Sequence, residues 1–444
     1  MEKVIIVGAG LVGSLQAIYM AKKGFDVEVY ERRPDMRKVD LVAGRSINLA
    51  LSNRGWKAIS EAGIQGEIEK IAIPMRGRMM HDENGNTTFQ QYGKDDEAIY
   101  SVSRGLLNQK LMNCADTFSN VEFFFNHQCL DVSLTNNELT FLDTSTNEKK
   151  TVNDGKIFAT DGAFSAIRKR LMKTDRFNYQ QMYLEHGYKE LTIPAAEGGG
   201  FKIDKNALHI WPRGEYMMIA LANEDGSFTC TLFFPFEGKN SFESIKTKID
   251  VEQFFTSVFP DAVALMPNLV EEYFENPTAS LVTVRCSPWN YKDQIVMMGD
   301  SSHAIVPFYG QGMNSGFEDC TVFNQIFEAN NMDWSKSFKE FSDTRKKDAD
   351  AISNLALQNF IEMRDLVADE SFLLRKKIEK KIYSKYPDKW VPLYSQVTFS
   401  HTPYSEALAN GKRQEKIMDC IMAKSNIEEI WDSQEVEDEI LEMI

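Results

Sequence analysis

The sequence predicts an α/β protein with three parts: a parallel-sheet domain, an inserted β-sheet region and a helical C-terminal region. The N-terminal residues read as strand, turn, helix and strand, which is typical of a parallel sheet. From about Thr192 to Thr283 the chain is rich in β-branched and aromatic residues, and after Trp334 helical spacing dominates, as in Phe338–Val367. With 444 residues, 43% of them hydrophobic, the chain can bury more than one core.

The charge of the chain limits its partners. The formal net charge is -15, so no nucleic-acid partner is expected, because binding phosphates needs a basic surface. After Lys424 there are eight acidic residues and no basic one. We interpret this tail as a solvated helix face or a frayed terminus.

Targeting and metal signals are not apparent in the sequence. The N-terminus has no signal-peptide pattern, and no window has the 18 or so apolar residues that span a bilayer. The histidines have no metal-ligand spacing, so no metal is expected. Six cysteines without CxxC spacing indicate reduced thiols, and we expect a soluble, cytoplasmic monomer or dimer. They are Cys114, Cys129, Cys230, Cys286, Cys320 and Cys420.

The opening of the chain predicts a dinucleotide-binding unit. Lys3–Val7 reads as a buried strand, Leu11–Lys23 as a helix that ends at Gly24, and Asp26–Tyr30 as a second strand. Between the first strand and the helix lies a GxGxxG motif, formed by Gly8, Gly10 and Gly13. Its glycines allow a tight turn, close approach of a pyrophosphate and close packing of helix and strand.

Glu31 strengthens this interpretation. It lies 18 residues after Gly13, near the offset of about 20 expected for a carboxylate that accepts from ribose hydroxyls. A structural glycine turn is the simpler alternative, but the strand, helix and acidic residue together favour a dinucleotide. They do not separate NAD from FAD.

Two further segments favour FAD. The strand Lys156–Ala159 is followed by Asp161-Gly162-Ala163-Phe164-Ser165-Ala166-Ile167-Arg168, and the strand Gln294–Met298 by Gly299-Asp300 and a glycine-rich loop. An ordinary turn would explain Asp161-Gly162 alone. The DGxxSxxR and GD patterns, in this order, resemble the class A flavoprotein monooxygenases. That resemblance implies bound FAD, with Asp161 and Asp300 at the cofactor.

The same resemblance implies the division of the chain. The expected fold is like that of p-hydroxybenzoate hydroxylase, a Rossmann-like FAD domain with an inserted β-sheet substrate domain. Because only one GxGxxG is present, NADPH is expected as a transient co-substrate without a domain of its own. The expected FAD domain covers residues 1–73, 100–178 and 285–330, the substrate domain 74–99 and 179–284, and the helical region 331–444.

Several stretches narrow the resemblance to the kynurenine 3-monooxygenase family, over roughly residues 3 to 415. They are Gly44–Ser52, Pro74–Met79, His186–Tyr188, Leu208–Arg213, Phe228–Leu232 and Asn359–Arg364. The resemblance implies hydroxylation of L-kynurenine at ring carbon 3, with O2 and NADPH, through a flavin C4a-hydroperoxide. The flavin carries the chemistry, so no catalytic side chain is expected. Eukaryotic relatives carry a hydrophobic C-terminal membrane anchor, whereas the acidic tail here is not expected to enter a bilayer.

The family's substrate residues match Arg78, Tyr92, Asn359 and Tyr404. A guanidinium suits the amino-acid carboxylate, although strand alternation alone would place Arg76 on the same face as Arg78. A two-residue turn at Asn84-Gly85 would put Gln91 opposite Arg78, so a pairing with Tyr92 needs a bulge or a longer loop.

Asn359 is also indicated by its own pattern. It shares a helical stripe with Ile352, Leu355 and Met363, so an amide is expected to point inward, where a satisfied core asparagine is the alternative. The resemblance assigns the remaining positions. Pocket-wall residues are Pro307, Phe308, Gln311 and Phe236, and further cofactor contacts are Val12, Arg32, Arg33, Arg45, Ala50, Arg104, Cys129, Gly312, Met313 and Asn314.

Three alternatives stay open from the sequence. A class A hydroxylase could act on another aromatic acid, since regioselectivity depends on pocket shape. An FAD-dependent dehydrogenase would share the fold without inserting oxygen, and a non-catalytic FAD protein would show no substrate-stimulated NADPH oxidation.

Overall fold

The computed structural model describes residues 2–38, 48–94, 97–366 and 369–444. Its first sheet is six-stranded, and parallel except for the edge strand β18. The strand order is β18 (Asn290–Tyr291), β19 (Ile295–Met297), β12 (Lys156–Ala159), β1 (Lys3–Val7), β2 (Asp26–Tyr30) and β8 (Val121–Phe124). Strands that are remote in the sequence therefore end at one edge of the sheet.

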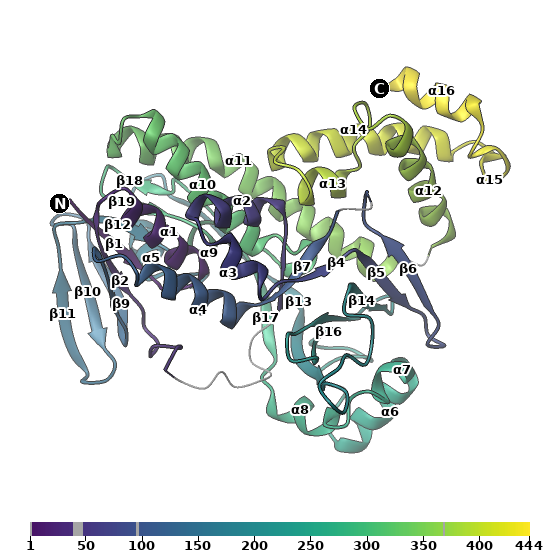
Figure 1. Ribbon diagram of the computed structural model, residues 1–444, viewed down its shortest axis with the longest axis horizontal. Coiled ribbons are helices and arrows are strands. Elements are labelled where there is room, and N and C mark those ends of the chain that lie inside the picture. Colours follow the sequence, from purple (N-terminus) through teal and green to yellow (C-terminus); the bar gives the residue numbers. More distant parts are fainter. Residues whose placement is uncertain (1, 39–47, 95–96, 367–368) are drawn as a thin grey trace.

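Helices and a small second sheet cover the first sheet (Figure 1). The helices α1 and α10 pack on each other, and α10 also packs on α2 and α11. Tyr30 stacks on Phe141 of the small sheet at a ring distance of 4.2 Å. The elements are α1 (Leu11–Lys22), α2 (Asn53–Ala62), α3 (Gln65–Glu69), α4 (Arg104–Ala115), α5 (Ala166–Leu171), α10 (Gly312–Ala329), α11 (Trp334–Ile361), β9 (His127–Ser133), β10 (Glu138–Asp143) and β11 (Glu148–Val152).

The β-rich region forms a sheet, as the sequence predicts, and this sheet has seven strands. Its order is β17 (Ala279–Ser287), β13 (Asn178–Ile193), β16 (Phe228–Pro235), β15 (Met217–Ala222), β14 (Ala207–Pro212), β5 (Gly77–His81) and β6 (Thr87–Gln91). A short three-stranded sheet has the order β3 (Asn48–Leu51), β7 (Ile99–Ser103) and β4 (Ile73–Met75).

Side chains alternate between the two faces of the seven-stranded sheet. Met217 and Phe233 join the core beneath α11, whereas their neighbours Met218 and Phe234 join a separate core with three helices. These helices, α6 (Lys248–Val258), α7 (Pro260–Val263) and α8 (Leu269–Glu275), were not expected in this region. They lie beyond the outer face of the sheet in Figure 1.

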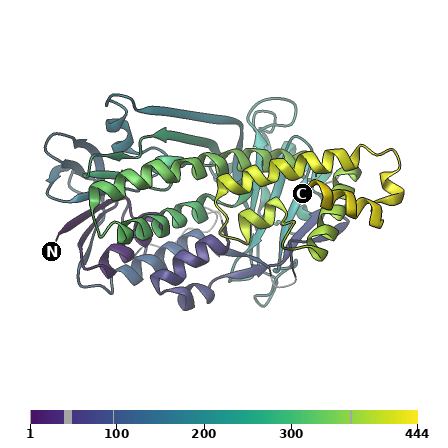
Figure 2. The same cartoon turned by 90° about the horizontal axis from the view of Figure 1, so that it is seen from above.

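The C-terminal region is helical, as predicted. Figure 2 shows the green helices α10 and α11 along the molecule and the yellow helices toward the end away from the N-terminus. A π-helical turn, Glu362–Leu366, ends α11. The other elements are α9 (Asp300–His303), the 3₁₀ turn η1 (Pro307–Tyr309), α12 (Glu370–Lys385), α13 (Leu393–Thr398), α14 (Tyr404–Met422), α15 (Ile427–Ile430) and α16 (Gln434–Met443).

Of the two expectations for the acidic tail, the solvated helix face is confirmed, because most of its acidic side chains are exposed, and the frayed terminus is wrong. Val436 and Ile440 of α16 are buried in a core with α12 and α14. Glu437 is buried as well, and it accepts from Lys385 at 2.6 Å and from the Tyr386 hydroxyl at 2.7 Å. The tail is therefore an amphipathic helix with one paired, buried carboxylate.

Candidate active site

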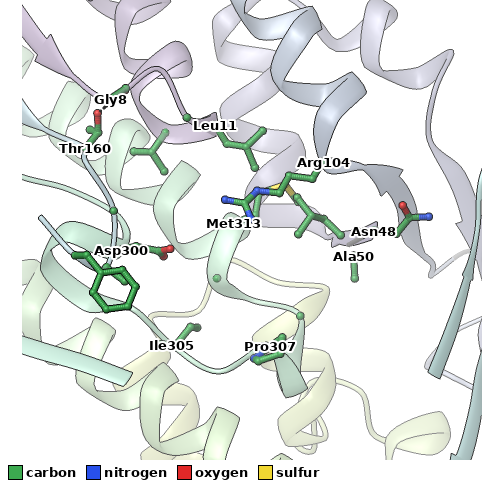
Figure 3. A pocket seen from close by; sticks show the side chains of 18 of the residues that line it. Gly8, Leu11, Asn48, Ala50, Arg104, Thr160, Asp300, Ile305, Pro307 and Met313 are labelled. Carbon is green, nitrogen blue, oxygen red and sulfur yellow. Dashed lines mark hydrogen bonds between the residues drawn. The ribbon is translucent and has the colours of Figure 1, made fainter. Parts of the chain in front are cut away.

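A cavity of about 640 Å³ runs between the first sheet and the seven-stranded sheet. One part is lined by the carboxyl ends of β1, β2 and β12, and another by Arg78, Asn359 and residues of β14 to β16. In Figure 3, Asp300 and Arg104 lie between Gly8 and Leu11 on one side and Ile305 and Pro307 on the other. One continuous space thus joins most of the predicted cofactor residues to two of the predicted substrate residues, Arg78 and Asn359.

The glycine turn after β1 has the geometry that the motif predicts. Gly8 has a φ of +103°, and a Cβ there would meet the Thr160 carbonyl oxygen at 2.6 Å. A Cβ at Gly13 would meet the Gly8 oxygen at 1.9 Å. Gly10 has no atom of the described residues within 4 Å of a Cβ position, so its backbone is open to the cavity. The first and third glycines serve packing, and the second leaves room for a ligand.

Glu31 lies at the end of β2 on the cavity wall. Its Oε2 accepts from the Ala9 backbone N–H at 2.9 Å, and its Oε1 accepts from the backbone and side chain of Arg33 at 3.0 and 2.9 Å. The carboxylate therefore fixes the glycine turn against the next strand. Arg32 and Arg33 also line the cavity.

Asp161 follows β12 and faces the same space. Its Oδ2 accepts from the backbone N–H of Ala166 at 2.7 Å, at the start of α5. Its Oδ1 is buried and, within the described part of the chain, has no hydrogen-bond partner. Burial raises the pKa of Asp161 above its ordinary value. A buried carboxylate oxygen without a partner costs stability, which fits a site that a polar ligand completes.

Asp300 is the first residue of α9, and its carboxylate is exposed to the cavity. The surrounding protein raises the pKa of Asp300 by desolvation, while the Arg104 guanidinium opposes that shift. Gly312 and Met313, at the start of α10, line the wall beside it, together with Val12, Ala50 and Cys129. These features fit a dinucleotide such as FAD: the open backbone at Gly10, the unpaired Oδ1 of Asp161 and the Asp300 carboxylate all face the same space.

Arg78 marks the other part of the cavity. Its side chain is 12% exposed and lies against two phenol rings, 5.0 Å from the Tyr394 ring and 5.7 Å from the Tyr92 ring. The two rings stack on each other at 5.2 Å. Arg78 Nε and the Tyr92 hydroxyl are buried without a hydrogen-bond partner among the described residues. A cation with a free Nε–H donor and phenols beside it is suited to a carboxylate.

The loop of the β5–β6 hairpin sets this arrangement. Its loop is longer than two residues, so Arg78 pairs with Gln90 instead of Gln91. This one-residue shift puts Tyr92 on the same face as Arg78. Arg76, the alternative from strand alternation, lies between β4 and β5 and is exposed.

Asn359 points inward from α11, as its stripe predicts. It is 5% exposed, lines the cavity and donates to the Phe308 carbonyl at 2.6 Å. Phe308 stacks on Phe360 at 4.0 Å and contacts Phe233 at 4.9 Å, so aromatic rings form the wall beside the amide.

Several predicted residues lie behind the wall. Among the described residues, those outside the lining are Gly13, Tyr92, Phe236, Gln311, Asn314 and Tyr404, and Arg45 lies outside the described residues. The Asn314 amide donates to the Ala50 and Gly310 carbonyls at 2.8 Å, so it joins β3 to the loop before α10. Phe236 instead packs beside Gly187 and Phe242.

Tyr404 is fully buried, and its hydroxyl donates to Gln311 Oε1 at 2.9 Å. The tyrosine of this region that lines the cavity is Tyr394, in the short helix α13, which sequence reasoning missed. No periodic pattern marks it, since α13 has only six residues. Other lining residues that were missed include Thr160, Phe164, Lys169 and Tyr309.

Comparison with known proteins identifies the family of the chain. Residues 1–331 match the family model described as FAD binding domain. A kynurenine 3-monooxygenase of Flavobacterium johnsoniae is 52% identical over 100% of this chain and 98% of the relative. One of Dictyostelium discoideum is 45% identical over 97% of this chain and 95% of its own length.

The chain belongs to the kynurenine 3-monooxygenase family. It is accordingly an FAD-dependent aromatic monooxygenase.

Solved structures support the fold of the family. A tetrameric 2-methyl-3-hydroxypyridine-5-carboxylic acid oxygenase has a TM-score of 0.66 at 15% identity and covers 88% of this chain and 98% of its own. The p-nitrophenol 4-monooxygenase PnpA from Pseudomonas putida has a TM-score of 0.65 at 15% identity, covering 93% of this chain and 99% of its own. The p-hydroxybenzoate hydroxylase-like fold class expected from the sequence is thereby confirmed.

The described residues also bear on disulfides, metal sites and membrane-spanning helices. All six cysteines are free thiols. In the described ranges, no cluster of His, Cys, Asp or Glu is arranged to hold a metal ion. None of the helices within those ranges combines the length and apolar character needed to cross a membrane.

Proposed function

We propose that this protein hydroxylates L-kynurenine at ring carbon 3, with NADPH, a proton and O2, to give 3-hydroxy-L-kynurenine, NADP⁺ and water. The observation that supports this most is the buried Arg78 beside Tyr92 and Tyr394, in the cavity that also contains the FAD-binding features. The relatives named kynurenine 3-monooxygenase align over essentially the whole chain, so the substrate region is included.

The cofactor is assigned to the glycine-lined part of the cavity. Bound FAD supplies two-electron transfer and oxygen activation there. Gly10 admits its phosphates, and Glu31, Asp161 and Asp300 accept hydrogen bonds from its hydroxyl or N–H groups. NADPH is proposed as a transient co-substrate, because the sequence has a single GxGxxG. We also propose the domain boundaries expected from the sequence: residues 1–73, 100–178 and 285–330 for FAD, 74–99 and 179–284 for the substrate, and 331–444 for the helical region.

The substrate is assigned to the Arg78 part of the cavity. Arg78 binds the amino-acid carboxylate, with Tyr394 and Asn359 as further hydrogen-bonding groups, and Tyr92 supports the guanidinium from behind. Phe233 and Phe308 pack against the aromatic ring and exclude water. The ring amino group already makes carbon 3 electron-rich, so the residues need only orient the ring and need not supply a strong base.

The direct test is to mix purified protein with L-kynurenine, NADPH and ¹⁸O2. We expect a product heavier than kynurenine by one ¹⁸O atom, with NADPH oxidation that depends on kynurenine. Oxidation of NADPH without a labelled product would indicate a dehydrogenase instead. Turnover of another aromatic acid, but not of kynurenine, would indicate a different class A hydroxylase, and no stimulated oxidation at all would indicate a non-catalytic FAD protein.

Arg78→Ala tests the substrate assignment. Loss of a bidentate, charge-assisted contact is expected to raise the KM for kynurenine about 100-fold, corresponding to about 3 kcal/mol, while FAD stays bound. Arg76→Ala is the matched control, because Arg76 is exposed on the same segment. Loss of FAD with an unchanged KM in Arg78→Ala would contradict the assignment.

A further inference from the structure

The short helix α9 carries Asp300, and both of its ends are held by other parts of the protein. It begins after Gly299, which has a φ of +61° that favours glycine. It ends at His303, four residues after Gly299. A helix of this length makes very few internal hydrogen bonds, so contacts from outside must fix its direction.

Asp319 supplies these outside contacts from α10. Its side chain is fully buried and is not part of the cavity lining. One oxygen, Oδ2, accepts from the Gly299 backbone N–H at 2.8 Å and from His303 Nε2 at 2.5 Å. The other, Oδ1, accepts from Arg345 Nε at 2.8 Å. One carboxylate oxygen therefore holds both ends of the turn on which Asp300 sits.

The charge on Asp319 is maintained by its neighbours. Burial alone would raise the pKa of Asp319, but His303 and Arg345 lower it more, so its pKa lies below the ordinary value. His303 is also stacked on Trp289 at 5.1 Å, which fixes the ring plane. An ionised carboxylate with three donors forms strong, directional hydrogen bonds.

Arg345 does not depend on Asp319 alone. Its guanidinium also pairs with Glu318 at 2.7 Å and donates to the Ser315 carbonyl at 3.1 Å. Neutralising Asp319 therefore leaves Arg345 with a carboxylate partner. Glu318 is the residue before Asp319 in α10, and among the described residues it forms ion pairs with Arg54 and Arg345.

We propose that Asp319 is a positioning residue for FAD: by holding Gly299 and His303, it directs the Asp300 carboxylate into the cofactor part of the cavity. The inference rests on FAD binding by this cavity, but not on the identity of the aromatic substrate. Asp319 acts through Asp300 and does not itself contact the cavity.

The test measures FAD binding to apoprotein by quenching of flavin fluorescence. Asp319→Asn keeps the side-chain shape but loses the charge and one acceptor, so we expect the dissociation constant of FAD to rise about 10-fold to 100-fold. Glu318→Gln is the matched control and should change FAD affinity less than about threefold, since it weakens the same Arg345 network without reaching α9. The visible spectrum of the bound flavin should change only in Asp319→Asn.

A second variant, at His303, tests the proposal even if Asp319→Asn does not fold. His303→Leu removes the donor at one end of the same contact, and we expect FAD affinity to fall about threefold to tenfold while the apoprotein still folds cooperatively. Unchanged FAD affinity in either folded variant, or equal loss in Glu318→Gln, overturns the inference. Failure of the wild-type apoprotein to bind FAD would overturn the proposed function instead.

Discussion

Arg78 shows how a single residue can reveal a ligand. Its guanidinium is almost fully enclosed, and the carboxylate oxygen of Glu362 that faces it is 3.9 Å away, beyond hydrogen-bond distance. A buried cation with an unpaired donor, here Arg78 Nε, is costly unless something completes its contacts. The phenol rings of Tyr92 and Tyr394 offset part of this cost through cation–π contacts. An amino-acid carboxylate would supply the rest.

Tyr394 and Tyr404 are expected to differ in role, with Tyr394 binding the substrate and Tyr404 stabilising the fold. Tyr394→Phe is expected to raise the KM for kynurenine about tenfold, because one hydrogen bond near the carboxylate is lost, with little change in stability. Tyr404→Phe is expected to leave KM unchanged but lower the free energy of unfolding by about 1–2 kcal/mol, since Gln311 loses its buried partner. Steady-state kinetics and urea unfolding check both, and a reversed pattern would restore Tyr404 as the substrate tyrosine.

The sequence predicted these residues unequally. Asn359 was foreseen, because an amide within an apolar stripe of a long helix is a local pattern. Arg78 could not be separated from Arg76, because the break between β4 and β5 that exposes Arg76 has no signal in the sequence. Tyr394 approaches the cavity only through tertiary packing of α13, and the resemblance pointed to Tyr404 instead.

Among the elements, those with local patterns were predicted best. β1 and β2 have the predicted bounds, and α1 ends within one residue of its predicted end. The helix α6 was missed although its capping box, Thr247 with Asp250, is present in the sequence. Its aromatic residues, including Phe254 and Phe255, resemble strand composition, and this composition outweighed the capping signal.

The helix α16 depends on Glu437. Pairing with Lys385 first, and then with Tyr386, lowers the pKa of Glu437 to about 2. The stability from this pairing is therefore present above the ordinary value near 4.5 and is lost as the pH falls through about 2.

At neutral pH, Glu437→Gln is expected to weaken the docking of α16 by about 1–3 kcal/mol, so hydrogen exchange of residues 434–443 should speed up tenfold or more. The matched control is Glu442→Gln, an exposed position on the same helix. Equal exchange rates in the two variants would show that the apolar residues alone dock the helix.

For the whole molecule, a buried histidine predicts sensitivity to acid. His209 is 2% exposed, donates to the Asp204 carbonyl at 2.7 Å and contacts His81 at 2.8 Å. Burial lowers the pKa of His209 to about 4, whereas the unfolded chain has its ordinary value of 6.5. Protonation therefore favours the unfolded state, and stability falls as the pH drops from about 6.5 to about 4.

Through His209 alone, the free energy of unfolding should fall by about 3 kcal/mol over this pH range, because each unit of pKa shift is worth about 1.4 kcal/mol. Urea unfolding at pH 7.5, 5.5 and 4.5 measures it. His209→Gln should be less stable at pH 7.5 but lose less between pH 7.5 and 4.5 than the wild type. An equal loss in both proteins would assign the acid sensitivity to other groups.

The strand order of the first sheet has a consequence for synthesis of the chain. β1 leaves the ribosome before the other strands of its sheet, but its neighbour β12 follows far later, and β19 must still be added beyond it. Nascent chains consequently expose an apolar, unpaired strand edge for most of translation, a state prone to association with other chains. Asn359 and Tyr394 come later still. A chain that ends before them can therefore form part of the cofactor site but cannot complete the substrate site.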